Sequence, residues 1–403
     1  MYQRAQVATL AERMLERENP LIQVVVGPRQ TGKSTMLSQA LERARAQAPL
    51  ASHFVSADDA LVPSPDWLLT EWQQARGMAR AAGPHTTTVL IVDEVQKVPH
   101  WATTVKSLWD ADQRTGGGPK VFLSGSSSLL LHEGIEDSLM GRFELVRSPH
   151  WGLAECSEAF GYSLDDYLYL GGYPGAARFA GDVSRWSSYL RDAVIEPTIS
   201  QDVLQMEPVR KPALMRSLFR LGATYSGQEL SYTKMVGQLQ DAGNTVTVAH
   251  YLDLLDKAGM LASIPKYDPK ELVRRRSSPR LMVYDTSLMT AISERGRERL
   301  LGEPDLRGHL VESAVGARLL ARSKEEGFEL HWWREGTREV DFVLSRGEAV
   351  SAIEVKGGHE SRQSGMGAFL AAHPEARRIV VAGSVAGACE LEDFLRDEVP
   401  LFW

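Results

Sequence analysis

Cysteine is scarce in this sequence, which has only Cys156 and Cys389 in 403 residues. Two cysteines so far apart form neither a zinc-binding cluster nor a disulfide framework, and they favour a reducing compartment. The sequence also lacks any run of about 18 apolar residues, so we expect no transmembrane helix and no membrane partner. Its first residues lack the apolar core of a signal peptide. Together these absences predict a cytoplasmic protein.

An excess of positive charge is absent too. The chain has 45 Lys and Arg against 52 Asp and Glu, which gives a formal net charge of −7. This balance argues against a uniformly basic coat for nucleic acid, although a local patch can still contact phosphates. The candidate DNA-binding patch is a group of arginines: Arg274, Arg275, Arg276 and Arg280.

The pattern of the sequence changes along the chain, which indicates several domains. Residues 1–150 alternate short apolar runs with helical patterns and predict an α/β domain, a parallel sheet with helices on both faces. Residues 151–208 are mostly helical, as in a lid or linker. Residues 209–300 read as a winged helix-turn-helix, and residues 301–403 as a smaller α/β domain.

Particular runs carry these assignments. In the first domain we expect strands at Ile22–Val26, His53–Ala57, Val89–Val92, Lys120–Ser124 and Phe143–Val146. In the winged-helix segment we expect helices at 229–239 and 247–258, followed by two wing strands at 261–267 and 280–284. The expected recognition helix carries few Lys or Arg residues, so direct reading of bases is a minority interpretation.

A phosphate-binding loop is the strongest single motif. The pattern G-x-x-x-x-G-K-[ST] is complete, follows an apolar strand and opens a helix, as ATP binding requires. The glycines let several N–H groups face one phosphate, Lys33 bridges the outer phosphates, and the Ser34 hydroxyl holds Mg²⁺. The nucleotide-binding residues are Gly27, Pro28, Arg29, Gln30, Thr31, Gly32, Lys33, Ser34 and Thr35.

Two acids follow the apolar run 89–92 and complete the predicted ATP site. A central parallel strand delivers them to the carboxyl edge of the sheet, where ligands bind in such folds. We expect Asp93 to hold the Mg²⁺ shell and Glu94 to polarise the attacking water. Ser124, or alternatively Ser126, ends another strand at the same edge and could orient that water.

The combination of motifs resembles one AAA+ family of bacterial and archaeal ATPases with a C-terminal PD-(D/E)XK nuclease-like domain. The resemblance rests on G-P-R-Q-T-G-K-S-T, D-E-V-Q, S-G-S-S, the run from Leu139 to Arg142, and Gly171-Gly172-Tyr173-Pro174. It covers nearly the whole chain. It implies that Ser124 is the sensor-1 residue and that Arg142 is an arginine finger, which acts on the nucleotide of a neighbouring subunit. A finger in trans implies a homo-oligomer, with a hexamer favoured.

The same resemblance directs attention to acids in the last domain. Asp341 begins one predicted strand, and Glu354 and Lys356 lie on the same face of the next; Glu312 matches a further acid of the family. A nuclease core of this kind would hold a second Mg²⁺ or Mn²⁺ there. The alternative is an ordinary ion pair in a fold that binds DNA without cutting it, and Val340 stands in place of the motif's proline. For the tryptophans at 332 and 333, we expect a contact in the core or with another subunit rather than base stacking.

Three functions are compatible with these features. The leading hypothesis is ATP hydrolysis coupled to binding and remodelling or translocation of DNA by a ring-shaped oligomer, with branched or junction DNA as a candidate substrate by analogy. The second is a nucleotide-controlled, metal-dependent DNA nuclease. The third is an ATP-dependent regulatory switch that acts on protein partners, which the acidic net charge favours.

Overall fold

The structure, a computed structural model, describes residues 2–16, 20–83, 85–126, 139–203, 211–241, 243–268, 277–356, 365–383 and 387–403. The chain divides into two compact units, an N-terminal one that ends at Pro149 and a C-terminal one that begins at His150. Within the described ranges, no helix is both long and apolar enough to cross a membrane.

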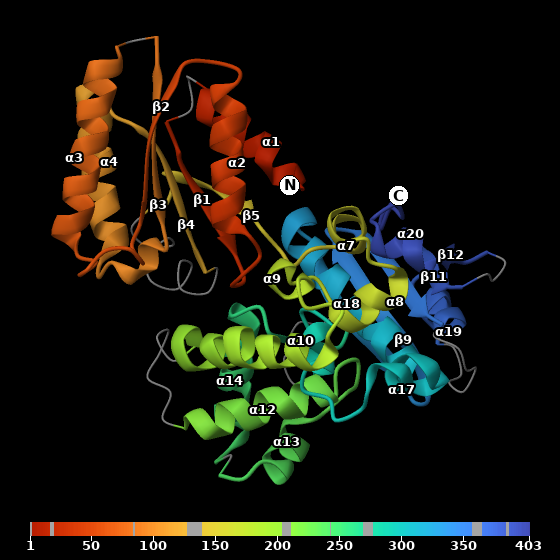
Figure 1. Cartoon of the computed structure of the whole chain (residues 1–403). Coiled ribbons are helices and arrows are strands. Elements are labelled where there is room, and N and C mark those ends of the chain that lie inside the picture. Colours follow the sequence, from red (N-terminus) through yellow and green to blue (C-terminus); the bar gives the residue numbers. More distant parts are fainter. Residues whose placement is uncertain are drawn as a thin grey trace. The chain divides into compact units, whose positions relative to one another are not determined.

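The N-terminal unit is a parallel sheet with helices on both faces (Figure 1). Its strands are β1 (Ile22–Gly27), β2 (Leu50–Ser56), β3 (Thr87–Asp93), β4 (Lys120–Ser126) and β5 (Phe143–Arg147). They lie in the order β2-β3-β4-β1-β5, and every neighbouring pair is parallel. The main helices are α1 (Ala5–Leu15), α2 (Lys33–Arg45), α3 (Pro65–Ala82) and α4 (Trp101–Thr115). The predicted α/β class is confirmed, and each predicted strand overlaps an observed one.

The interior strand β3 shows why this unit folds as a three-layer sandwich. Val89 and Ile91 pack in one core with α1 and α2, whereas Leu90 and Val92 pack in the other core with α3 and α4. A strand covered on both faces needs a continuous apolar run, which the sequence provides here. As a result β3 ends at Asp93 on the carboxyl edge of the sheet.

The C-terminal unit contains helices and a mixed sheet. Its first half comprises α7 (Leu153–Phe160), α8 (Leu164–Leu170), α9 (Pro174–Ala177), α10 (Val183–Leu190), the π-helical segments η3 (Arg191–Ile195) and η4 (Thr198–Val203), α12 (Pro212–Thr224), α13 (Tyr232–Gln238), α14 (Thr245–Lys257), β6 (Leu261–Ile264) and β7 (Arg280–Val283). Its second half comprises α16 (Ser287–Thr290), α17 (Arg297–Gly302), α18 (Pro304–Glu326), β8 (Glu329–Glu335), β9 (Arg338–Arg346), β10 (Ala349–Val355), α19 (Met366–Ala372), β11 (Arg377–Ala382), β12 (Cys389–Glu390) and α20 (Leu391–Leu395).

The pairing within this unit separates two sheets. Strands β6 and β7 form an antiparallel pair that follows α13 and α14, at the positions where helices and wing strands are expected. The larger sheet has the order β12-β11-β10-β9-β8, with antiparallel pairs from β8 to β10 and parallel pairs from β10 to β12. Strand β8 does not appear among the predicted strands. It carries Trp332, which is 1% exposed and therefore belongs to the core, as expected.

A buried carboxylate explains the Gly171-Gly172 pair of the C-terminal unit. Asp285 accepts hydrogen bonds from Gly172 N–H at 2.7 Å, Ser287 N–H at 3.0 Å and the Ser287 hydroxyl at 2.5 Å. Gly171 has a φ of +67°, and a Cβ added there would lie 1.9 Å from Asp285 Oδ1. Glycine is therefore required at this position, because no side chain fits between the loop and the carboxylate.

Asp285 should make stability depend on pH. Burial raises the pKa of this carboxyl from 3.8 to about 6, although three hydrogen bonds oppose the shift. Between these values the folded state keeps a proton that the unfolded chain has lost, so this contribution to stability is complete at low pH and decreases as the pH rises to 6. The full change is about 3 kcal/mol. Denaturant unfolding of the wild type and Asp285→Asn should show the wild-type advantage shrinking between pH 3.8 and about 6. A pH-independent difference would contradict this assignment.

Candidate active site

The loop between β1 and α2 curls through left-handed backbone at two positions. Gln30 has a φ of 59°, and Gly32, just before α2, has a φ of 89°. At the end of β1, a Cβ added to Gly27 would lie 2.1 Å from the carbonyl oxygen of Ser148, so glycine is required there too. The loop thus ends on the N-terminus of α2, where backbone N–H groups and the helix dipole favour an anion.

Lys33, the first residue of α2, is buried beneath this loop. Its ammonium donates hydrogen bonds to the carbonyl oxygens of Gly27 at 3.1 Å and Pro28 at 2.8 Å. The side chain therefore follows the inner side of the loop. Ser34 and Thr35 follow on the first turn, and both are exposed.

Asp93 brings the ends of three elements together. Its Oδ2 accepts a hydrogen bond from the Ser34 hydroxyl of α2 at 2.5 Å, and its Oδ1 accepts one from the Ser124 hydroxyl of β4. The strand order makes this possible, because β4 lies between β1 and β3. A hydroxyl and a carboxylate are the hard oxygen ligands that Mg²⁺ takes together with nucleotide phosphates, so these residues fit the expected ion.

Glu94 occupies the turn after β3 in a strained conformation. Its φ of 52° and ψ of 38° are left-handed, which is uncommon outside glycine. Burial raises the pKa of Glu94 above its ordinary value, while the nearby Lys33 ammonium opposes the shift. Gln96 donates a hydrogen bond to Glu94 Oε2 at 2.5 Å and thereby fixes the carboxylate. A held carboxylate of raised basicity beside the loop is suited to accept a proton.

A buried chain of hydrogen bonds supports the phosphate loop, and it includes residues that belong to no sequence motif. Arg4 donates to the Ser148 hydroxyl at 2.9 Å, Ser148 donates to Thr31 at 3.2 Å, and Thr31 donates to the carbonyl oxygen of Pro28 at 3.1 Å. Arg4 is only 3% exposed. No sequence motif marks Arg4 or Ser148, because Ser148 contacts the loop from over a hundred positions away and Arg4 acts on the loop through Ser148.

Family models divide the chain into three parts. Residues 19–156 match the model of an AAA domain, and this stretch contains the loop, Asp93, Glu94 and all five parallel strands. The N-terminal unit has the P-loop AAA+ fold. Residues 161–299 and 307–393 match two domains of unknown function, DUF8612 and DUF4143.

Whole-chain comparisons find distant relatives. An uncharacterized protein of Mycobacterium tuberculosis is 28% identical over 308 residues, which are 76% of this chain and 61% of that protein. This chain thus spans about 61% of the length of its mycobacterial relative. An uncharacterized protein of Haemophilus influenzae is 20% identical over 376 residues, 86% of this chain and 88% of that one.

Similar solved structures have low overall scores. The Aeropyrum pernix ORC1 protein in complex with DNA has a TM-score of 0.32 at 14% identity, over 72% of this chain and 91% of that chain. AMPPCP-bound DnaA from Aquifex aeolicus has a TM-score of 0.32 at 16% identity, over 62% of this chain and 86% of that chain.

Arg142 lies at the opposite edge of the AAA+ sheet from the phosphate loop. Its carbonyl oxygen accepts the N–H of Ile22 at 2.9 Å, at the start of β1, whereas the loop follows the end of that strand. A strand of this length spans about 20 Å. The guanidinium pairs with Asp110 of α4 at 2.8 Å and holds the pKa of that carboxyl below its ordinary value. Arg142 is therefore too far away to serve the nucleotide of its own AAA+ unit.

The acids of the C-terminal unit are only partly brought together. The β9–β10 register pairs Phe342 with Ile353 and so brings Asp341 opposite Glu354 at the next position. Asp341 Oδ2 accepts the Val355 N–H at 2.8 Å, and Lys356 is exposed just beyond β10. Within the described parts of the chain, no three His, Cys, Asp or Glu side chains are placed to hold a metal. The described side chains therefore do not support the second Mg²⁺ or Mn²⁺ that the sequence predicts there.

The predicted arginine patch divides into two parts. Arg274, Arg275 and Arg276 lie outside the described residues. Arg280 is the first residue of β7 and is 1% exposed, with carboxylates around its guanidinium. The prediction that Arg280 contacts DNA does not fit this position, because a phosphate contact needs an accessible cation.

Proposed function

We propose that this protein hydrolyses Mg-ATP in its AAA+ unit and uses the cycle to bind and remodel DNA as a homo-oligomer. The observation that carries the hydrolysis is the Asp93 carboxylate, which joins the Ser34 and Ser124 hydroxyls beside the buried Lys33. A carboxylate, hydroxyls and a lysine ammonium are the groups that phosphoryl transfer from ATP requires.

Each side chain has a distinct task in this proposal. The loop N–H groups and Lys33 bind and orient the phosphates, and Ser34 with Asp93 would hold Mg²⁺, which neutralises charge on the phosphate oxygens when bound. Glu94 accepts a proton from the attacking water. Ser124, fixed by its hydrogen bond to Asp93, orients that water as the sensor-1 residue.

The position of Arg142 supports assembly into an oligomer. An arginine a strand's length from its own loop can act as a finger only on the nucleotide of a neighbouring subunit. Each site then needs a partner, and head-to-tail contacts of this kind close into rings. A hexamer is the ring size that we favour.

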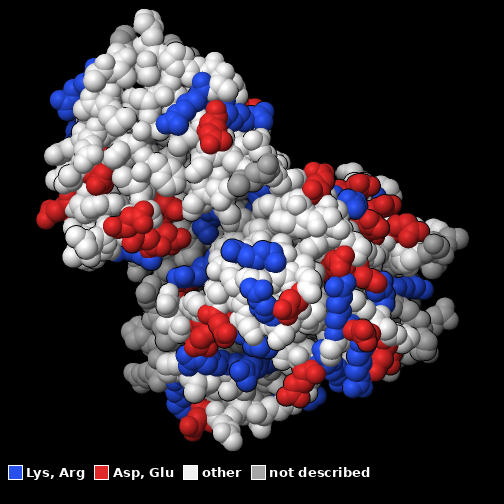
Figure 2. Space-filling model, viewed as in Figure 1, with Lys and Arg blue, Asp and Glu red and all other residues white. Residues whose placement is uncertain are grey.

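The distribution of surface charge helps to distinguish a DNA partner from a protein partner. On the face shown in Figure 2, Lys and Arg side chains are interspersed with Asp and Glu rather than gathered into one basic surface. On α14, the expected recognition helix, Lys257 pairs with Asp253 at 2.9 Å. DNA binding therefore depends on local contacts within the C-terminal unit and rests on the family resemblance. The mixed charge favours a second candidate, a regulatory switch that acts on a protein.

Turnover in the presence of different DNA forms separates the two candidates. We expect one form among duplex, single strand and four-way junction to raise phosphate release by about tenfold over the DNA-free rate, a change of about 1.4 kcal/mol in barrier. Raising the salt concentration should reduce the stimulation, since phosphate contacts release counterions. Equal turnover with every DNA form would reject DNA coupling and leave the protein-directed switch.

A further inference from the structure

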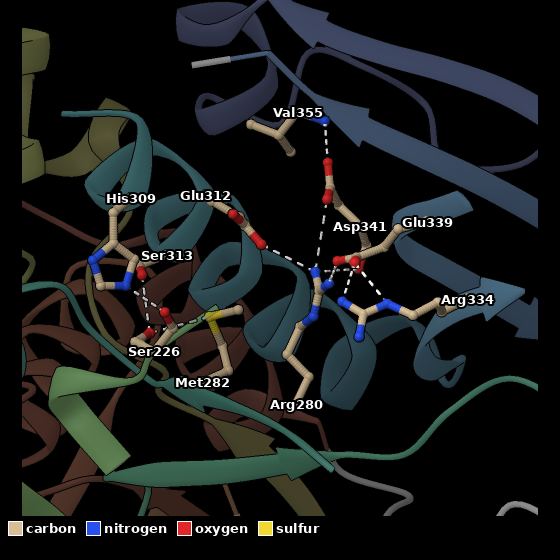
Figure 3. Close-up of polar contacts among 10 residues, drawn as sticks. All are labelled: Ser226, Arg280, Met282, His309, Glu312, Ser313, Arg334, Glu339, Asp341 and Val355. Atoms are coloured by element: carbon tan, nitrogen blue, oxygen red, sulfur yellow. Dashed lines mark hydrogen bonds and ion pairs between the residues drawn. The ribbon is translucent and has the colours of Figure 1, made fainter. Parts of the chain in front are cut away.

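The guanidinium of Arg280 lies at the centre of a group of carboxylates (Figure 3). One terminal nitrogen donates to Glu312 Oε1 at 3.0 Å and to the Asp341 carbonyl oxygen at 3.0 Å, and it lies 3.7 Å from Asp341 Oδ1. The other terminal nitrogen pairs with Glu339. A single buried cation thus faces three acids, two of which are the predicted metal ligands Glu312 and Asp341.

A second arginine completes this cluster from β8. Arg334 pairs with Glu339 and with Glu229, so Glu339 lies between two guanidinium groups. Both guanidinium groups lie over the ring of Trp332, each 5.4 Å from its centre. Planar guanidinium groups suit such stacked, forked contacts, which a lysine ammonium cannot reproduce.

Both carboxylate oxygens of Asp341 already face a donor or a cation. Its Oδ2 accepts the Val355 N–H, and its Oδ1 faces Arg280. A divalent ion would have to displace a buried cation that already balances these charges. We propose that Arg280 is the resident cation of the acid cluster and occupies the place where a nuclease of the predicted kind would need its metal.

The space next to the cluster opens onto Glu339 rather than onto the predicted metal ligands. A cavity of about 410 Å³ adjoins the cluster, and Arg280, Arg334 and Glu339 contribute to its wall. An ion such as Mn²⁺ therefore has space beside Glu339, whereas Glu312 and Asp341 do not belong to the cavity wall. What it lacks is a set of free ligands, because the guanidinium groups hold them.

The cluster also joins two parts of the C-terminal unit. Arg280 belongs to β7, whereas its acidic partners belong to α18 and β9. Backbone hydrogen bonds run alongside, from Tyr267 N–H to the Trp332 carbonyl oxygen at 2.6 Å and from Trp332 N–H to that of Pro265 at 3.2 Å. The acids thus fasten β7 to α18 and to the larger sheet.

Mn²⁺ binding to the full-length chain without nucleotide tests this assignment. Electron paramagnetic resonance of free Mn²⁺ counts bound ions in the wild type and Asp341→Asn, and we expect equal numbers because Asp341 does not ligate a metal. Arg280→Gln should bind one Mn²⁺ more than the double variant Arg280→Gln with Asp341→Asn. The proposal would be overturned if the wild type bound one ion more than Asp341→Asn. It would also be overturned if Arg280→Gln bound no more ions than the double variant.

Thermal unfolding gives a readout that does not depend on metal. Removing one partner of a buried ion pair lowers the melting temperature of a unit this size by about 10 °C, so Arg280→Gln should show a loss of this order. Arg338→Gln is the matched control, because Arg338 is 53% exposed and its pair with Glu335 is 3.8 Å long. Arg280→Lys should lie between them. Equal, small losses for Arg280→Gln and Arg338→Gln would refute a central cation. If Arg280→Gln does not fold, the wild-type and Asp341→Asn ion counts decide.

Discussion

Replacing Glu94 by Gln should reduce ATP turnover by about 10²- to 10⁴-fold, the usual contribution of a positioned general base. The amide cannot take the proton of the attacking water, yet it keeps the size of the carboxylate and can still accept the Gln96 hydrogen bond. Nucleotide affinity should therefore stay close to that of the wild type. Phosphate release measures the first quantity, and titration with a fluorescent ATP analogue measures the second.

Lys33→Ala is the control that separates binding from hydrolysis. Lys33 reaches the inside of the loop. Its removal should weaken nucleotide binding as well as turnover, because in the proposed site the ammonium would bind the phosphates themselves. A Glu94→Gln protein that hydrolyses ATP within about twofold of the wild type would show that another group serves as the base. The loss expected from losing this base is far larger than twofold.

Much of the AAA+ unit could be predicted because its signals are local. The loop motif combines glycines, a lysine and a hydroxyl within nine positions, and the run before Asp93 is apolar throughout. Each signal predicts a strand, and the carboxyl ends of such strands lie at one edge of a parallel sheet. These signals place Asp93, Ser34 and Ser124 at that edge, and the observed order β3-β4-β1 brings them into contact.

Contacts between distant residues could not be predicted in this way. The Arg4–Ser148–Thr31 chain and the Arg142–Asp110 pair join positions with no shared motif. Arg280 has the sequence context of a surface patch, since three arginines lie close before it. The signal against that interpretation is the apolar run Leu281-Met282-Val283 directly after it, which marks a buried strand. A cation at the start of a buried strand must be paired with acids nearby, because an unpaired buried charge is unfavourable.

Arg142 gives the second large effect, which mixing experiments can separate from a purely structural role. Arg142→Ala alone should lose about 10³-fold or more in turnover, the range for arginine fingers. Asp110→Asn removes the same intramolecular ion pair and leaves the arginine in place, so it should keep most of the activity. Equal losses in both variants would mean that the pair acts only by holding α4 to the start of β5.

Complementation then tests whether the arginine acts between subunits. Arg142→Ala keeps an intact loop, and Lys33→Ala keeps an intact arginine, so each is inactive alone for a different reason. In a random 1:1 mixture about one ring interface in four joins an intact loop to an intact arginine. We therefore expect phosphate release to recover to about a quarter of the wild-type rate. A mixture as inactive as its components would exclude a finger in trans, and the distance of Arg142 from its own loop would then leave it no part in catalysis.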